Sequence, residues 1–445
     1  MKTFRIGGVH PHDNKTYSAH KQITEVPLPQ KAVIPLVQHI GAPSKPIVQK
    51  GDEVKVGQLI AEAGGFVSAN IHSPVSGKVQ KIDAIKDAWG MTMPAIFIDV
   101  EGDEWLPEID RTPTINNICK LEAKEIIEKI KAAGIVGLGG ACFPTHVKLM
   151  PPPGKTAEVL VVNGVECEPY LTCDHQLMLE HGEEIMIGIQ ILMKALGISK
   201  AVIGIEKNKP DAIEHMQKLA SHTLGVSVEP LNLRYPQGGE KQLIDACIRR
   251  QVPSGALPIE VGAVVDNVAT IYAVYEAVQK NKPLISRVMT VTGKEVKNPG
   301  NYLVRFGTPL SDVMTVAGGV PETTGKIIGG GPMMGRAMNN IDMPANKRVS
   351  GMLLLPESES LRKKPENCIR CGKCVSACPM GLEPYLLSKL SAYQRWDDME
   401  THNVMDCIDC GCCQFTCPSA RPLLDYIRVG KATVGANIRA RAAAK

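Results

Sequence analysis

Two runs of cysteines near the C-terminal end have the spacing of iron–sulfur ligands. Each run reads CxxCxxCxxxCP. Three thiolates at three-residue spacing can wrap one corner of a four-iron cube, and in two-cluster proteins the fourth cysteine of each run binds the other cluster. The spacing therefore predicts two [4Fe–4S] clusters, one bound by Cys368, Cys371, Cys374 and Cys417 and the other by Cys407, Cys410, Cys413 and Cys378.

A zinc site built from CxxC pairs is the alternative interpretation of these runs. A zinc site would give no role to the third cysteine and the Cys-Pro pair of either run, so we favour two [4Fe–4S] clusters. Two such clusters in one module would conduct single electrons. Cys412 fits neither run and is expected to bind no metal. The residues between the runs predict a helix whose apolar stripe holds Leu386, Leu387, Leu390 and Tyr393.

A glycine-rich segment, GLGGACFPTHVK at 137–148, is the second part of the chain whose residues could bind a cofactor. It fails the dinucleotide pattern GxGxxG, because Cys142 stands at the sixth position and the segment follows a predicted helix rather than a strand. The glycines alone favour an ordinary turn. The bare backbone amides of Gly137 to Ala141 and the cation of Lys148 can nevertheless meet a phosphate and the face of a flat ring.

The composition limits the classes to which the chain can belong. Its 445 residues predict about three domains, and 44% apolar with 22% charged residues is typical of a packed protein. A net charge of +4 and an aromatic content of 4% argue against nucleic acid as a partner. Neither a stretch of 18 apolar residues nor a secretory signal occurs, so we expect a cytoplasmic chain that spans no membrane itself. In that reducing compartment clustered thiolates hold metal more often than they form disulfides.

The elements around the glycine-rich segment alternate between apolar strands and amphipathic helices. This alternation predicts a parallel α/β sheet, and such sheets bind ligands at the carboxyl ends of their strands. The expected elements are a helix at 121–133, a strand at 157–163, a helix at 175–196, a strand at 201–205, a helix from Pro210 and a strand near 226–234.

Four segments resemble the NADH-oxidising flavoprotein of respiratory complex I: GLGGACFPTHVK, NGVECEP at 163–169, GGEKQL at 238–243 and VDNVAT at 265–270. The resemblance implies a noncovalently bound FMN, with NAD(H) as the substrate and no catalytic acid or base, since hydride transfer needs none. It assigns cofactor or nucleotide contacts to Gly137, Gly139, Gly140, Ala141, Phe143, Lys148, Asn163, Glu166, Glu168, Gly239, Glu240, Asn267 and Thr270, with Phe143 and Glu168 on the nicotinamide side. Leu138, Val165, Lys241 and Asp266 depart from that family's pattern, which argues against nucleotide contacts through these four positions.

The flanking regions resemble known small modules. Residues 30–105 resemble the biotinyl/lipoyl-type barrel-sandwich hybrid, without the lysine at a hairpin tip that carrier function needs, and 284–350 resemble the soluble ligand-binding β-grasp (SLBB) module, in which we interpret Gly329 to Gly331 as a turn. The expected fold is a multidomain combination of α+β and α/β modules. Its expected parts are an N-terminal arm (1–29), the barrel-sandwich hybrid (30–105), an FMN- and NADH-binding α/β domain (115–283), the β-grasp domain (284–350), a helical two-cluster ferredoxin domain (360–430) and a basic C-terminal tail (431–445).

The order of these modules, opened by FRIGGVHP, is similar to that of the RnfC family, which belongs to the Rnf ion-translocating ferredoxin:NAD oxidoreductase complexes. That family implies electron passage between ferredoxin and NAD through FMN and two [4Fe–4S] clusters, while partner subunits translocate Na⁺ or H⁺. It also implies a peripheral position on the cytoplasmic side of the cell membrane. The implied partners are integral membrane subunits and a ferredoxin-like subunit, with ferredoxin reacting indirectly.

Two other functions are alternatives to the one that the RnfC resemblance implies. The cobalamin reductase of bacterial microcompartments resembles the chain from the glycine-rich segment onward, but the hundred residues before it favour the Rnf family. A structural electron wire that binds no nucleotide is a different class, against which the four flavin segments argue. The basic C-terminal residues are expected either to help docking or to form a solvated tail; they are Arg421, Arg428, Lys431, Arg439, Arg441 and Lys445.

Overall fold

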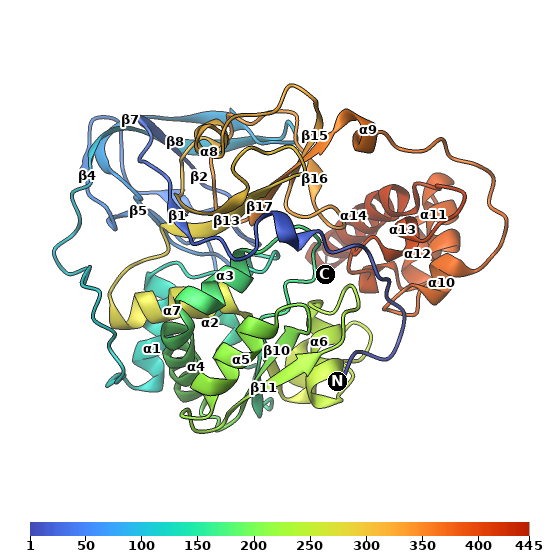
Figure 1. Cartoon of the computed structure of the whole chain (residues 1–445), viewed down its shortest axis with the longest axis horizontal. Helices are drawn as coiled ribbons and strands as arrows, with labels where there is room; N and C mark the ends of the chain where they lie inside the picture. The colour runs from blue at the N-terminus through green and yellow to red at the C-terminus, as the bar shows by residue number, and fades with distance from the viewer. Residues whose placement is uncertain (445) are drawn as a thin grey trace.

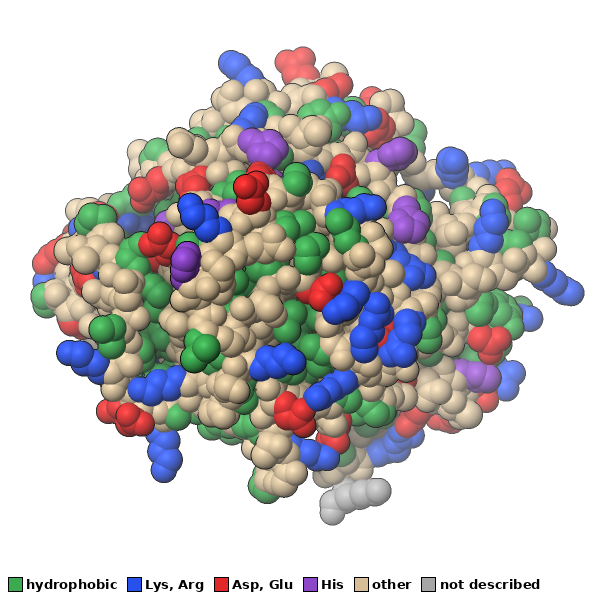
Figure 2. Space-filling model, turned by 60° about the horizontal axis from the view of Figure 1, so that its bottom comes forward, with side chains coloured by type: hydrophobic (Ala, Val, Ile, Leu, Met, Phe, Trp, Pro, Cys, Tyr) green, Lys and Arg blue, Asp and Glu red, His purple; other side chains and the backbone are tan. Residues whose placement is uncertain are grey.

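Residues 1–444 are described in the computed structural model, and they form an N-terminal arm and four modules (Figure 1). Two β modules lie together at the top of this view, the α/β module lies below them and the cysteine-rich helical module lies at the right. Basic, acidic and apolar side chains are interspersed over the face in Figure 2, as the nearly balanced charge predicts. Among the described residues no helix is both long and apolar enough for a membrane span.

The α/β module contains a sheet of four parallel strands in the order β11-β10-β9-β12. The strands are β9 (Val159–Asn163), β10 (Ala201–Glu206), β11 (Val226–Leu231) and β12 (Ala263–Asn267). The predicted parallel sheet is therefore confirmed. The chain proceeds from β9 to β10 and β11 on one side and returns to β12 on the other, so strand order reverses between β9 and β12. Such a switch point opens a crevice at the carboxyl ends of the two strands.

Helices cover both faces of this sheet. One face packs against α1 (Ala123–Ala132), α3 (Cys173–Glu180), α4 (Gly182–Leu196), α5 (Pro210–Ala220) and α7 (Val268–Gln279), and the other against α6 (Glu240–Ile248). The single helix expected at 175–196 is two helices. His181 separates them, and Gly182, the first residue of α4, packs against the His215 and Leu219 side chains of α5.

The barrel-sandwich module contains a four-stranded and a three-stranded sheet, as expected. Buried apolar residues of these strands, such as Ala32 and Ile34 of β2, form a separate core. The strands are β2 (Lys31–Pro35), β8 (Thr92–Gly102), β7 (Ser76–Lys86) and β4 (Glu53–Val54) in one sheet, and β3 (Lys45–Pro46), β5 (Leu59–Glu62) and β6 (Ile71–His72) in the other.

The second β module extends beyond the boundary expected at residue 350. Its sheet has the order β1-β14-β13-β17-β15-β16, and β17 lies between β13 and β15. The apolar run GMLLLP of β17 pairs on both sides, and β1 comes from the N-terminal arm. The elements are β1 (Thr24–Glu25), β13 (Ser286–Thr292), β14 (Gly300–Arg305), α8 (Leu310–Val316), β15 (Thr324–Gly329), β16 (Arg336–Ala337), β17 (Gly351–Pro356) and α9 (Glu357–Ser360).

The cysteine-rich module is helical, as expected, but two details differ. The helices are α10 (Lys373–Ser376), α11 (Pro384–Ala392), α12 (Trp396–Thr401), α13 (Cys412–Phe415) and α14 (Leu423–Ala443). Tyr393 is 69% exposed rather than buried, because α11 ends one residue before it. The basic tail expected from 431 is instead the second half of α14, where Val434 is buried and Arg441 pairs with Glu400 at 2.6 Å. Lys445 lies outside the described residues.

A buried lysine joins three modules and makes their assembly sensitive to pH. Lys347 Nζ donates to the carbonyl oxygens of Asn70 at 3.1 Å and Gly134 at 2.7 Å, and burial lowers its pKa to about 7. Between that value and 10.5, the ordinary value for lysine, the unfolded chain binds a proton that the folded chain lacks. The free energy of unfolding should therefore increase as pH rises through this window.

Denaturation measured between about pH 7 and pH 10 checks this expectation. Lys347→Met should flatten part of the increase, whereas Lys50→Met, at an exposed position, should leave it unchanged. An equal slope in all three proteins would contradict the assignment to Lys347.

Candidate functional site

The glycine-rich loop lies at the switch point between β9 and β12. Asn163 and Asn267 end these two strands and are paired in register, and a Cβ atom on Gly139 would lie 3.0 Å from Asn267 Cβ. Gly140 has φ 134°, and a Cβ atom there would meet nothing within 4 Å. Gly139, Gly140 and Ala141 are exposed. The loop therefore presents bare backbone to an open space above the strand ends, which we call the cradle.

The ammonium group of Lys148 lies in the cradle near two carboxylates. Lys148 Nζ donates to the Val265 carbonyl at 2.7 Å and lies 3.6 Å from both Glu240 Oε1 and Asp266 Oδ1. Burial acts to lower the pKa of Lys148, but the carboxylates of Asp266 and Glu240 outweigh it and the pKa is raised. The ammonium group therefore keeps its charge at neutral pH.

Asp266 has a buried carboxylate whose two oxygens accept no hydrogen bond within the described chain. Burial raises its pKa, and the Lys148 charge opposes this. A buried acceptor without a donor costs free energy, so the site calls for a ligand with N–H or O–H groups. A flavin has a ring imide N–H, ribityl hydroxyls and a phosphate. The exposed amides, the lysine and the unpaired acceptors of the cradle fit that set of groups.

Removing the Asp266 charge should weaken flavin binding. We expect Asp266→Asn to raise the dissociation constant of FMN about tenfold, because hydrogen bonds to a charged acceptor are among the stronger ones. Fluorescence titration of the flavin-free chain measures this constant. Asp312→Asn, at an exposed position on α8, is the control. Unchanged or tighter FMN binding by Asp266→Asn would show that the carboxylate does not face the flavin.

The two strand-end asparagines and Thr270 hold the cradle in shape. Asn163 Nδ2 donates to the Gly238 carbonyl at 2.9 Å, and Asn267 Oδ1 accepts from the Ala269 N–H at 2.9 Å as the cap of α7. Thr270 Oγ1 accepts from the Leu138 N–H at 2.8 Å and so fixes the loop from behind.

The structure thus places three groups of the expected cofactor-contact residues around one space. They are Gly139 to Ala141 on the loop, Lys148 with Glu240, and Asn163 with Asn267, while Gly239 precedes α6 at its edge. Leu138 points into the core, which accounts for its departure from the complex I pattern. Asp266 is the cradle residue that sequence reasoning missed; an acidic residue at a strand end beside Asn267 was the available signal.

The remaining expected contacts lie elsewhere. Phe143 closes the loop through its carbonyl, which accepts from the Gly137 N–H at 2.9 Å. Glu166 Oε1 accepts from the Asp174 N–H at 2.8 Å in the first turn of α3. Glu168 accepts from the backbone N–H groups of Met333 and Met334 at 3.1 and 2.8 Å. The two glutamates use their oxygens within the chain, and a contact with nicotinamide stays a prediction for them and for Phe143.

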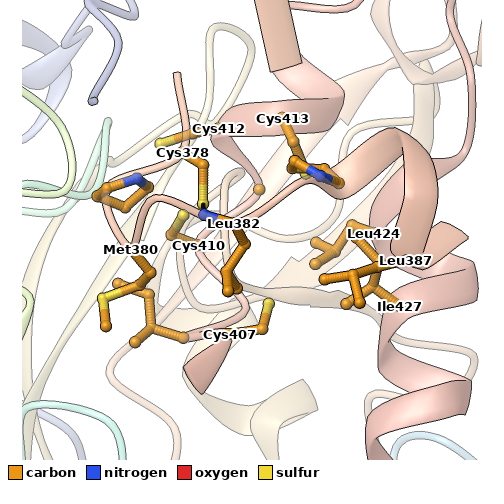
Figure 3. A pocket seen from close by; sticks show the side chains of 14 residues that line it. Cys378, Met380, Leu382, Leu387, Cys407, Cys410, Cys412, Cys413, Leu424 and Ile427 are labelled. Carbon is orange, nitrogen blue, oxygen red and sulfur yellow. Dashed lines mark hydrogen bonds between the residues drawn. The ribbon is translucent and has the colours of Figure 1, made fainter. Parts of the chain in front are cut away.

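Four of the predicted cluster ligands surround one hollow. Cys378, Cys407, Cys410 and Cys413 line a space of about 360 Å³, part of it open to solvent, together with Leu387, Leu424 and Ile427 (Figure 3). The fourth cysteine of the first run thus joins three cysteines of the second, as the two-cluster pattern predicts. Thiol groups and an apolar wall fit an iron–sulfur cluster. We call these four residues the inner set.

The other four form an outer set. Cys374 and Cys417 are half-buried, and α10 packs against α13. Burial raises the pKa of the Cys374 thiol and the nearby Cys417 thiolate raises it further, which reflects their closeness. Cys368 and Cys371 belong to a segment in which every residue from 361 to 372 is exposed. This half of the ligand set lies at the molecular surface.

Cys412 also borders the inner hollow, but its thiol is engaged elsewhere. Its side chain is fully buried, and Sγ donates to the Tyr235 carbonyl at 3.8 Å. That Cys412 binds no metal stays a prediction.

Comparisons with known proteins identify the same modules. Family models match residues 2–103 (RnfC barrel sandwich hybrid domain), 130–276 (Nuo51 FMN-binding domain), 288–337 (SLBB domain) and 360–418 (4Fe-4S dicluster domain). An NAD⁺-reducing [NiFe]-hydrogenase structure is similar with a TM-score of 0.48 and 18% identity, over 70% of this chain and 61% of that chain.

Curated relatives match along nearly the whole chain. The C subunit of the proton-translocating ferredoxin:NAD(+) oxidoreductase complex of Clostridium ljungdahlii is 49% identical, over 96% of this chain and 93% of its own length. Its counterpart in the Na(+)-translocating complex of Acetobacterium woodii is 43% identical, over 98% of both. With all four modules in place, the chain belongs to the RnfC family of ion-translocating ferredoxin:NAD(+) oxidoreductase complexes.

Proposed function

We propose that this chain is the NAD(H)-reacting component of an ion-translocating ferredoxin:NAD oxidoreductase complex. It passes electrons between NAD(H) and one-electron carriers through FMN in the cradle and two [4Fe–4S] clusters in the inner and outer sets. The observation that carries the proposal is the presence, in one chain, of a flavin-type cradle and two sets of four cysteines. Relatives that match along nearly the whole chain and are named as components of such complexes support it.

The residues of the cradle bind and orient rather than transfer protons. The amides of Gly139 to Ala141 and the Lys148 ammonium are suited to the phosphate and the ring, and Asp266 to their donor groups. A bound flavin exchanges a hydride with nicotinamide and single electrons with iron–sulfur clusters. Hydride transfer of this kind needs no protein acid or base, and we assign none.

The outer set is the proposed point of exchange with partner subunits. Its exposed segment carries Lys363, Lys364 and Arg370, with Lys373 directly after it, and such a basic surface attracts acidic electron carriers. Ion translocation itself belongs to partner subunits in this proposal, and the chain sits peripherally on the cytoplasmic side of the membrane through them.

The microcompartment cobalamin reductase is less well supported. It was expected to lack the region before the glycine-rich loop, and residues 2–103 match the barrel-sandwich model of the RnfC family.

Anaerobic addition of NADH to the purified, cofactor-loaded chain tests the proposed function. NADH should bleach the flavin absorbance, and the iron–sulfur absorbance should then decrease. Dithionite, which reduces both groups without a nucleotide site, is the control. Bleaching by dithionite but not by NADH would contradict the proposal.

A further inference from the structure

One short segment of the α/β module reaches from the cradle to the inner cysteine set. Residues 235–240 begin at Tyr235, whose hydroxyl donates to the Cys410 carbonyl at 2.9 Å. They pass Gly238, which accepts from Asn163 at the cradle, and end at Glu240, 3.6 Å from Lys148. A continuous stretch of backbone therefore connects the flavin site with a ligand of the inner cluster.

Tyr235 is fixed from several directions. Its ring is 3% exposed, and its hydroxyl also lies 3.2 Å from Glu168 Oε1. Two backbone N–H groups of the β-grasp turn at 329–335 in turn hold the Glu168 carboxylate in place beside the tyrosine. The Tyr235 N–H and carbonyl pair with Val9 of the N-terminal arm at 2.9 Å. The N-terminal arm thus fixes the Tyr235 backbone, and Glu168 lies beside the hydroxyl that contacts Cys410.

Further contacts hold the backbone at Cys378. Gln242 Nε2 donates to the Pro379 carbonyl at 3.2 Å, and the Gly8 N–H donates to the Ala377 carbonyl at 2.9 Å. A Cβ atom on Gly7 would lie 2.4 Å from the Cys378 carbonyl carbon, so this approach requires glycine. The inner set is therefore bound to the flavin module through Tyr235 at Cys410 and Gln242 at Pro379, and to the N-terminal arm beside Cys378, whereas Cys368 and Cys371 of the outer set lie in an exposed segment.

We propose that Tyr235 is a positioning residue that seats the inner cluster against the flavin module, so that electrons pass between flavin and inner cluster before the outer cluster. Oxidation of one NADH to NAD⁺ yields two electrons and one proton. The electrons leave the flavin singly, and the first moves on to the outer cluster before the second arrives. Each cluster ends with one electron and the flavin is oxidised again. The inference rests on the proposed function, because it assumes that these cofactors are bound.

Tyr235→Phe, which removes only the hydroxyl, tests the inference. Tyr302→Phe is the matched control, because Tyr302 is also buried and donates to a backbone carbonyl, that of Asn298 at 2.6 Å. Light-driven reduction of the flavin makes the measurement independent of NADH. We expect Tyr235→Phe to keep FMN and iron but to slow the flavin-to-cluster step about tenfold, and to alter the EPR signal of the inner cluster. Tyr302→Phe should behave as the unmodified chain.

An unchanged flavin-to-cluster rate in a Tyr235→Phe protein with full cofactor content overturns the inference. If that variant loses the inner cluster, the seating role is supported, and Gln242→Met then carries the rate measurement with the same expected decrease. Rapid light-driven transfer in a chain that NADH cannot reduce would leave this inference standing while the proposed function fails.

Discussion

Replacing Cys413 with alanine is expected to lower the iron content of the chain from about eight atoms to about four, while FMN stays bound. Cys413 lines the inner hollow, and Cys412, the other thiol at this hollow, donates to the Tyr235 carbonyl instead. Cys378→Ala should remove the same cluster, although it belongs to the other cysteine run. Cys374→Ala and Cys417→Ala should remove the outer cluster instead. Iron and sulfide analysis with EPR spectroscopy distinguishes the two losses.

The control for this series is Cys412→Ala, which should keep both clusters because its thiol faces the Tyr235 carbonyl. The loss of one and the same EPR signal from Cys378→Ala and Cys374→Ala would contradict the exchange of the fourth ligand between runs. Stoichiometric zinc without sulfide in the unmodified chain would contradict the clusters altogether.

Substitution of Gly140 by valine should empty the flavin site and leave the iron content unchanged. The backbone at Gly140 has φ 134°, which L-residues rarely adopt, and a side chain there would project into the open cradle. We expect the bound FMN to fall below about a tenth of its normal content, since strain and lost space act together. Gly139 is a less direct target, because its Cβ atom would point at Asn267 rather than into the cradle.

Gly154→Val separates backbone strain from the loss of the site. Gly154 also has a positive φ, of 80°, and open space around its Cβ position, but it lies in an exposed loop beyond the cradle. This variant should bind FMN normally. Full FMN content in Gly140→Val would show that the flavin lies elsewhere.

Sequence reasoning succeeded where the chemistry is local. The cysteine spacing fixes which thiolates stand together within each run, and the alternation of strands and helices predicts the parallel sheet and its ligand-binding end. The end expected for the helix at residue 196 is also confirmed, because α4 ends at Leu196 and Gly197 follows in the left-handed conformation.

The features that were missed depend on contacts between distant segments. Tyr235 meets Cys410 across 175 positions, and no local pattern marks it. β17 joins its sheet by pairing with strands far before it, so the boundary at 350 was wrong. The basic residues after 430 resemble a tail in sequence, because Arg441 finds Glu400 only once α14 packs on α12.

The most direct test of the whole account is rapid mixing of NADH with the unmodified chain and with Cys413→Ala. In the unmodified chain the flavin should bleach first, and the EPR signals of the inner and then the outer cluster should follow. In Cys413→Ala the flavin should bleach at the same rate while the outer cluster stays oxidised on that time scale. Reduction of the outer cluster at an undiminished rate in Cys413→Ala, or a flavin that NADH does not bleach in either protein, would contradict the account.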